Sequence, residues 1–188
     1  MEAIKKHLTK TFTSYELELL RYLYLCITYE GSKFLILLIF FSFFHLGVEF
    51  CMEVLFLLAL RNFFGGLHFN HYISCFAFTL AFSSTGIALS HLAILDNNLQ
   101  ISLLSIAILI SAVTKPVTST CRPPLSVMQE NIYHCCGMFV LFAYFAFFLT
   151  IQTFPYRNLC FWVIILQTLQ LTTARLLMKG ETRLWKHV

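Results

Sequence analysis

Residues 34–60 read FLILLIFFSFFHLGVEFCMEVLFLLAL, and the way in which this stretch folds decides the arrangement of the whole chain. A transmembrane helix needs about 20 mainly apolar residues, so the stretch is either one long tilted span or two short ones. Gly47 and Glu49 interrupt it near the middle. A charged side chain inside a span is costly, which favours two helices, over residues 34–48 and 50–60.

The composition of the chain is that of a membrane protein. It has 188 residues, of which 59% are hydrophobic and 12% are charged, and its mean hydropathy is +0.77. A soluble domain of ordinary composition is about 25% charged. The length suits one domain, and the apolar stretches leave too little polar sequence for a separate soluble module. We therefore expect an all-α fold, a polytopic bundle of membrane helices.

Four further apolar segments follow residue 60, each near the length of a spanning helix. Together with the two helices of residues 34–60 they predict about six transmembrane helices, with both termini on one side of the membrane. The four segments cover residues 72–95, 99–113, 132–151 and 159–178.

The distribution of basic residues supports this count. With six spans, Arg157 is the one cation that falls on the outer side, and the positive-inside rule then places both termini in the cytoplasm. A single span over residues 34–60 would reverse every later segment and spoil the agreement. The net charge of +4 includes no dense basic run, which argues against nucleic acid as a partner. The inner cations are Lys5, Lys6, Lys10, Arg21, Lys33, Arg61, Lys115, Arg122, Lys179, Arg183 and Lys186.

Residues 1–33 differ from the rest of the chain because charges of both signs run through them. They lack the short apolar core of a cleaved signal peptide. Their apolar residues recur at steps of three or four, as in amphipathic helices that lie in the lipid interface or pack on the protein's own spans. Thr13 and Glu16 have capping-box spacing, and Gly31 is placed to stop a helix over about residues 14–30. We therefore divide the chain into interfacial helices (1–33) and a transmembrane domain (34–188).

The candidate catalytic residues lie in residues 61–75, which read RNFFGGLHFNHYISC. A cysteine nucleophile needs a base that takes its proton and later returns it to a leaving amine, and His68 and Cys75 supply this pair. On one straight helix they would lie about 10.5 Å apart along the axis, too far for a hydrogen bond. The backbone must therefore break, and Gly65 and Gly66 allow the unusual torsions of a break.

The neighbours of this pair suggest further roles. Amides of Gly65 and Gly66 are candidates for holding an oxyanion. If Cys75 lies in the first turn of its helix, the helix dipole and Arg61 both favour its thiolate. The other six cysteines form no CxxC motif, and the odd total argues against a disulfide framework.

A metal site is the alternative explanation of the same segment. His68, His71 and Cys75 are spaced at i, i+3 and i+7 and would share one helical face. Three such ligands can bind zinc, but the sequence offers no evident fourth ligand. This alternative predicts that chelators abolish activity.

Residues 61–75 resemble the signature of the accessory gene regulator B family, membrane peptidases that process the precursor of a quorum-sensing peptide. The family pattern is an arginine, three residues, two glycines, one residue, a histidine, and a cysteine seven positions later. This pattern is matched by Arg61, Gly65, Gly66, His68 and Cys75. The charged N-terminal region, the short spans and a loop with prolines and cations around residues 115–124 are also similar.

The resemblance implies a reaction and its partners. Cys75 would attack a carbonyl near the C-terminus of a small amphipathic precursor, and His68 would protonate the leaving amine. An internal cysteine or serine of the precursor would then capture the acyl group as a thiolactone or lactone. Lys115 and Arg122 would bind the acidic tail, although both are explained equally well as topology-setting charges. The resemblance further implies a bacterial plasma membrane, a lipid environment, a homodimer and no cofactor.

A second class of function remains open from the sequence. In a small transporter or a structural membrane protein, the cysteine and the histidine would only pack, and Cys75→Ser and His68→Ala would be tolerated. The peptidase hypothesis predicts that either change abolishes release of the precursor's tail.

Overall fold

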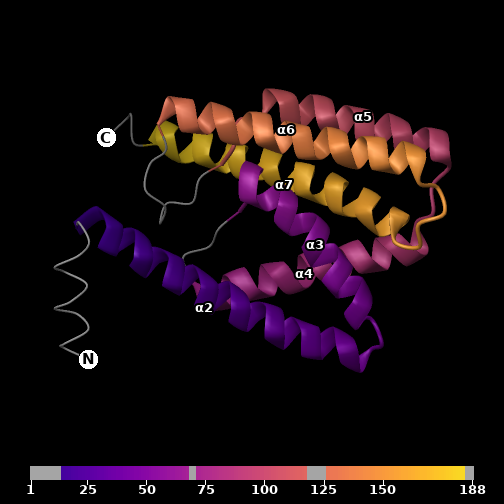
Figure 1. Ribbon diagram of the computed structural model, residues 1–188, viewed down its shortest axis with the longest axis horizontal. Helices are drawn as coiled ribbons and strands as arrows, with labels where there is room; N and C mark the ends of the chain where they lie inside the picture. Colours follow the sequence, from indigo (N-terminus) through magenta and orange to yellow (C-terminus); the bar gives the residue numbers. More distant parts are fainter. Residues whose placement is uncertain (1–13, 68–70, 118–125, 185–188) are drawn as a thin grey trace.

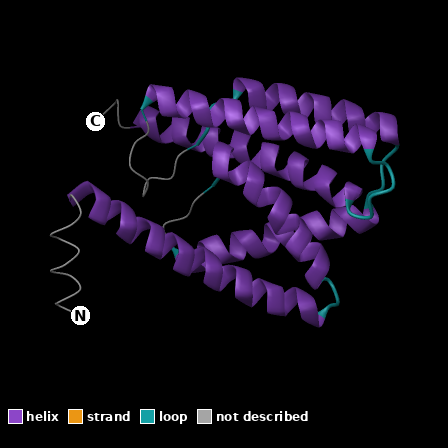
Figure 2. Cartoon of the chain, in the orientation of Figure 1, coloured by secondary structure: helices purple, strands orange, loops and turns teal. Residues whose placement is uncertain are grey.

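The protein, represented by a computed structural model, is described for residues 14–67, 71–117 and 126–184 (Figure 1). These residues form helices joined by short loops, without a strand (Figure 2), so the expected all-α fold is confirmed. The helices are α2 (Ser14–Phe43), α3 (Gly47–Phe64), α4 (Tyr72–Leu92), α5 (Asn97–Val113), α6 (Val127–Thr150) and α7 (Arg157–Leu184).

The stretch at residues 34–60 forms parts of two helices, as the sequence predicts. The chain turns between α2 and α3, where the amide of Leu46 donates to the carbonyl of Phe41 at 2.9 Å. His45 has a φ of 59° in this turn. A Cβ on Gly47 would lie 2.6 Å from the hydroxyl oxygen of Ser42, so the start of α3 lies close to the end of α2. Helix α3 starts at Gly47, and Glu49 lies in its first turn.

The expected helix end at Gly31 is wrong, because α2 runs through this residue to Phe43. A glycine inside a helix costs about 1 kcal/mol, which neighbouring interactions easily offset. Glu30 and Lys33 form an ion pair across the glycine, and the hydroxyl of Ser32 donates to the carbonyl of Tyr29. The boundary expected at residue 33 therefore lies within one continuous helix.

Helix α7 occupies the centre of the bundle. It packs against α3, α4 and α5, while α6 packs on α3 and α5, and α2 packs on α3 and α4 (Figure 1). Phe161 and Val163 of α7 have 0% of their surface exposed. Phe148 on α6 packs its ring on that of Phe161 and is also buried. The core is thus a layer of apolar side chains around α7.

The outer surface of the bundle is apolar as well. Large apolar side chains such as Leu109, Phe139 and Leu176 are more than half exposed, which in water would be unfavourable over so many positions. Three helices of the described chain are long and apolar enough to cross a membrane, namely Tyr72–Leu92, Val127–Thr150 and Arg157–Leu177. Helix α5 is apolar but shorter. These features are those of a helical membrane protein, and the count of six spans stays a prediction.

The two ends of the bundle differ. The ends of α3 and α5 and the starts of α2 and α6 lie toward one end, at the left of Figure 1, together with the end of α7. The short turns at 44–46, 93–96 and 151–156 lie toward the other end. Consecutive helices therefore run in opposite directions, and residues 65–67 after α3 and 114–117 after α5 lie at the same end.

Candidate active site

The break expected between Arg61 and Cys75 is present, and Gly65 makes it. Helix α3 ends at Phe64, and Gly65 has φ 73° and ψ −150°, a conformation essentially restricted to glycine. A Cβ at this position would lie 1.9 Å from the carbonyl oxygen of Val117. The amide of Gly65 donates to the carbonyl of Arg61 at 2.9 Å, so it is already used in ending the helix. Gly65 thus supports the site through its backbone conformation.

Two other segments hold this turn in place. The amide of Val117, in the loop after α5, donates to the carbonyl of Phe64 at 2.9 Å. From α7, the side-chain amide of Gln167 donates to the carbonyl of Gly65 at 2.8 Å. A Cβ on Gly66 would lie 2.6 Å from the amide nitrogen of Gln170, so Gly66 is also tightly enclosed. The turn at Gly65 and Gly66, called the glycine turn below, is therefore held by the loop after α5 and by α7.

Cys75 lies in the first turn of α4, so the condition set in the sequence for a favoured thiolate is met. The helix starts at Tyr72, and the amide of Cys75 donates to the carbonyl of the extended cap residue His71 at 3.1 Å. Only 3% of the surface of Cys75 is exposed. The first turn of a helix carries the positive end of its dipole, which favours a negatively charged sulfur.

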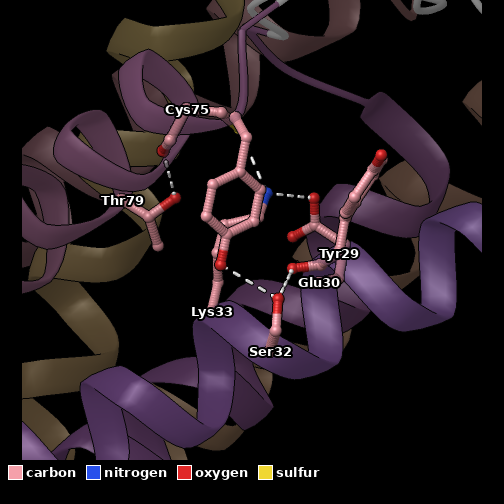
Figure 3. Close-up of polar contacts among 7 residues, drawn as sticks. Tyr29, Glu30, Ser32, Lys33, Cys75 and Thr79 are labelled. Atoms are coloured by element: carbon pink, nitrogen blue, oxygen red, sulfur yellow. Dashed lines mark hydrogen bonds and ion pairs between the residues drawn. The ribbon is translucent and has the colours of Figure 1, made fainter.

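Lys33 of α2, whose sequence context indicates a topology-setting charge, is a cation in contact with Cys75. Its Nζ lies 3.2 Å from Cys75 Sγ and 2.5 Å from a carboxylate oxygen of Glu30 (Figure 3). The ammonium also lies 5.9 Å from the centre of the Tyr72 ring. Lys33 is 3% exposed, although it stands directly before the apolar half of α2. No local sequence signal points to this contact, because it joins residues 42 positions apart.

Lys33 remains charged in this environment. Burial disfavours the ammonium most of any single cause, but the hydrogen bonds and charge interactions with Glu30 and Cys75 together outweigh it and raise the pKa of Lys33 above its ordinary value. A lysine with a raised pKa is protonated throughout the neutral range. Cys75 therefore faces a fixed positive charge.

A cavity of about 550 Å³ lies beside this contact, between α2, α3 and the glycine turn. Its wall is apolar on one part and charged or polar on another. Gly65, Gly66 and Thr79 line it too, and the hydroxyl of Thr79 donates to the carbonyl of Cys75 at 2.9 Å. The apolar lining includes Phe34, Leu37, Phe50 and Leu57, and the polar lining includes Glu30, Lys33, Arg61 and Asn62.

The residues expected at the site fall into three groups. Arg61, Gly65 and Gly66 line the cavity, and Cys75 contacts Lys33, which also lines it. Lys115 is 54% exposed at its side chain and lies 3.8 Å from the carboxylate of Glu130 on α6. His68 and Arg122 lie outside the described residues.

The alternative zinc site shares His68 with the catalytic pair, so that histidine again lies outside the described residues. Within residues 14–67, 71–117 and 126–184, no three side chains of histidine, cysteine, aspartate or glutamate gather as a metal site. His71 is exposed, whereas Cys75 is buried. The two side chains therefore lie in different surroundings.

Comparison with known proteins agrees with the motif. Searches of curated protein sequences and of solved structures found no match. The sequence model of the family described as accessory gene regulator B matches residues 1–171, which include α2 to α6 and most of the apolar part of α7. The chain therefore belongs to the accessory gene regulator B family, membrane proteins that take part in processing a quorum-sensing peptide precursor.

Proposed function

We propose that the chain is a membrane cysteine endopeptidase and cyclase. The Cys75 thiolate attacks a backbone carbonyl near the C-terminus of the precursor, and a carbon–sulfur bond forms. The carbon–nitrogen bond then breaks, and the C-terminal tail leaves as an amine that takes its proton from His68. The product of this step is an acyl-enzyme thioester.

The second step closes a ring. A thiol or hydroxyl of the precursor attacks the thioester carbonyl and gives up its proton to His68, and Cys75 leaves. The Cys75 sulfur is then regenerated, and the released peptide is a thiolactone or a lactone. Exclusion of water favours this capture over hydrolysis. The cavity beside the glycine turn has an apolar wall, which supports such exclusion.

One observation carries the proposal most strongly. A buried cysteine in the first turn of α4 lies 3.2 Å from an ammonium, beside a cavity lined by Arg61 and the two glycines of the motif. The ammonium is paired with the Glu30 carboxylate, and its second contact, with the sulfur, brings positive charge to Cys75 as well. The arrangement is suited to a reactive thiolate.

The cavity fits a peptide better than a small polar molecule. Its apolar wall, with Phe34, Leu37 and Phe50, can take apolar side chains of the precursor next to the scissile bond. Arg61 and Asn62 on the polar wall can bind its backbone carbonyls. We further propose that Lys115 and Arg122 bind the acidic tail, that both termini and the site face the cytoplasm, and that the enzyme acts as a homodimer.

The test is coexpression of the chain with a candidate precursor, followed by mass measurement of the cleaved fragments. Cys75→Ser and His68→Ala should each abolish release of the tail, because one removes the thiolate and the other removes the proton donor. Both variants should still insert in the membrane at the level of the parent chain. Tail release by both variants would show that the pair only packs, as in a transporter or a structural membrane protein.

A further inference from the structure

We propose that Lys33 is a positioning residue for the proposed reaction, because it holds Cys75 in the thiolate form. The sequence motif points to Arg61 as the activating cation, but Lys33 is the residue whose Nζ lies 3.2 Å from the sulfur (Figure 3). The inference rests on the proposed function, in which the thiolate is the nucleophile. It assigns to α2 a part in the chemistry that begins on α4.

Burial gives the contact its strength. Lys33 and Cys75 are each 3% exposed, so bulk water screens the charge of the ammonium less than it would at the surface. A neutral thiol is a weak hydrogen-bond acceptor, whereas a thiolate accepts a charge-assisted hydrogen bond from an ammonium. Lys33 therefore lowers the free energy of the thiolate relative to that of the thiol.

Glu30 weakens the stabilisation of the Cys75 thiolate by Lys33. Its carboxylate lies 2.5 Å from the same Nζ, and its side chain is 47% exposed, so it competes with the sulfur for the ammonium. Arg61 of α3 lines the same cavity and adds positive charge. The titratable and charged groups of the described chain near Lys33 and Cys75 include Tyr29, Glu30, Arg61, His71 and Tyr72.

Substitutions of Lys33 and Glu30 should change the thiolate fraction of Cys75 in opposite directions. Lys33→Met removes the cation and should decrease the thiolate fraction of Cys75. Glu30→Gln removes the competing anion and should increase it. Lys33→Arg keeps the positive charge and should stay near the parent chain. A residue that merely holds α2 against α4 would not produce effects of opposite sign.

The experiment measures alkylation of Cys75 by iodoacetamide as a function of pH, in the purified full-length protein in lipid nanodiscs. Peptide mapping separates Cys75 from the exposed Cys51 and Cys135. A His68→Ala background removes the His68 imidazole, so that the pH dependence reports ionisation of the Cys75 thiol without that group, and the effect of Lys33 is read from the variants. Because the pKa of Lys33 is raised, Lys33 itself does not titrate in the neutral range.

In this background, Lys33→Met should slow alkylation at pH 7 about tenfold, equivalent to an upward shift of about one pH unit in the half-maximal rate. Glu30→Gln should speed it, and Lys33→Arg should remain within about twofold of the parent. An unchanged rate in folded Lys33→Met, or equal signs for Lys33→Met and Glu30→Gln, would overturn the proposal. If Lys33→Met fails to fold, the sign of the Glu30→Gln effect decides.

This measurement needs no precursor, so the two proposals can fail separately. A shift in alkylation without any tail release would support the role of Lys33 and remove the peptidase function. Tail release that is insensitive to Lys33→Met, with unchanged alkylation, would leave the peptidase function and remove the role of Lys33.

Discussion

At the scale of single residues, the site depends on the backbone of Gly65. Its φ and ψ are accessible to glycine and to almost no other residue, and the carbonyl of Val117 occupies the place of a side chain. The side-chain amide of Gln167 donates to the carbonyl of Gly65 and so holds this residue in place. The turn that separates α3 from α4 is therefore set by one residue and held by two distant ones.

Gly65→Ala should destabilise the protein by about 1–3 kcal/mol from backbone strain, with a further cost from the collision with Val117. The expected result is a lower apparent melting temperature in detergent, together with loss of tail release. Gly31→Ala is the matched control for stability. Its Cβ would meet nothing within 4 Å, and alanine in a helix should raise stability by about 0.5–1 kcal/mol. Equal melting temperatures for the two variants would contradict this account of the turn.

At the scale of helices, polar contacts tie α4, α5 and α7 together at the end of the bundle away from the glycine turn. The side-chain amide of Asn158 donates to the carbonyl of Ser90 at 2.6 Å and accepts from Gln100 at 3.0 Å. Trp162 donates to the carbonyl of Ala93 at 3.1 Å. These bonds satisfy carbonyls at the end of α4 that no helical turn can satisfy.

Asn158→Leu should cost about 1–3 kcal/mol, because it leaves the buried amide of Gln100 and the carbonyl of Ser90 without this partner. Thermal unfolding in detergent measures the loss. The double variant with Gln100→Leu should lose less than the sum of the two single variants, because it removes both members of the pair. Additive losses would show that the two side chains do not interact.

Arg157, the exception to the positive-inside rule, has a local explanation at this end of the bundle, away from the glycine turn. The guanidinium of Arg157 lies 3.7 Å from the centre of the Phe148 ring and donates to the side-chain oxygen of Asn97 at 2.5 Å. These contacts at the start of α7 hold the arginine side chain against α5 and α6. Arg157 therefore does not argue against the predicted orientation.

At the scale of the whole molecule, alternating helix directions place the loops after α3 and α5 at one end of the bundle. That end carries Lys115, and Arg61 lies in the last turn of α3. The other end carries Glu49 in the first turn of α3 and Asp96, which caps α5. The basic residues at the end with the glycine turn agree with its cytoplasmic placement, and Arg157 at the other end is the exception.

Alkaline phosphatase inserted within the full chain tests this orientation, because the enzyme is active only outside the cytoplasm. Insertions after Leu46, Asp96 and Phe154 should be active, and an insertion after Lys115 should be inactive. The insertion after Leu46 also tests whether α2 and α3 cross separately. Activity after Lys115 would reverse the proposed orientation and place the site on the outer face.

The sequence by itself determined the all-α membrane fold, the two helices of residues 34–60, the break at the glycine pair and the start of a helix near residue 72. Each of these depends on hydrophobic period or on the torsions of a glycine, which are properties of neighbouring residues. Local signals failed at Gly31, where side-chain interactions and packing outweigh the small helix penalty of glycine.

Only the tertiary structure decided which side chains meet at the site. The contact of Lys33 with Cys75, the bond from Gln167 to Gly65 and the pairing of Val117 with Phe64 each join helices or loops far apart in the chain. No periodicity encodes such pairs, because they depend on how α2, α4 and α7 pack. A charge that sequence patterns attribute to membrane orientation is thus brought by packing into contact with the Cys75 sulfur.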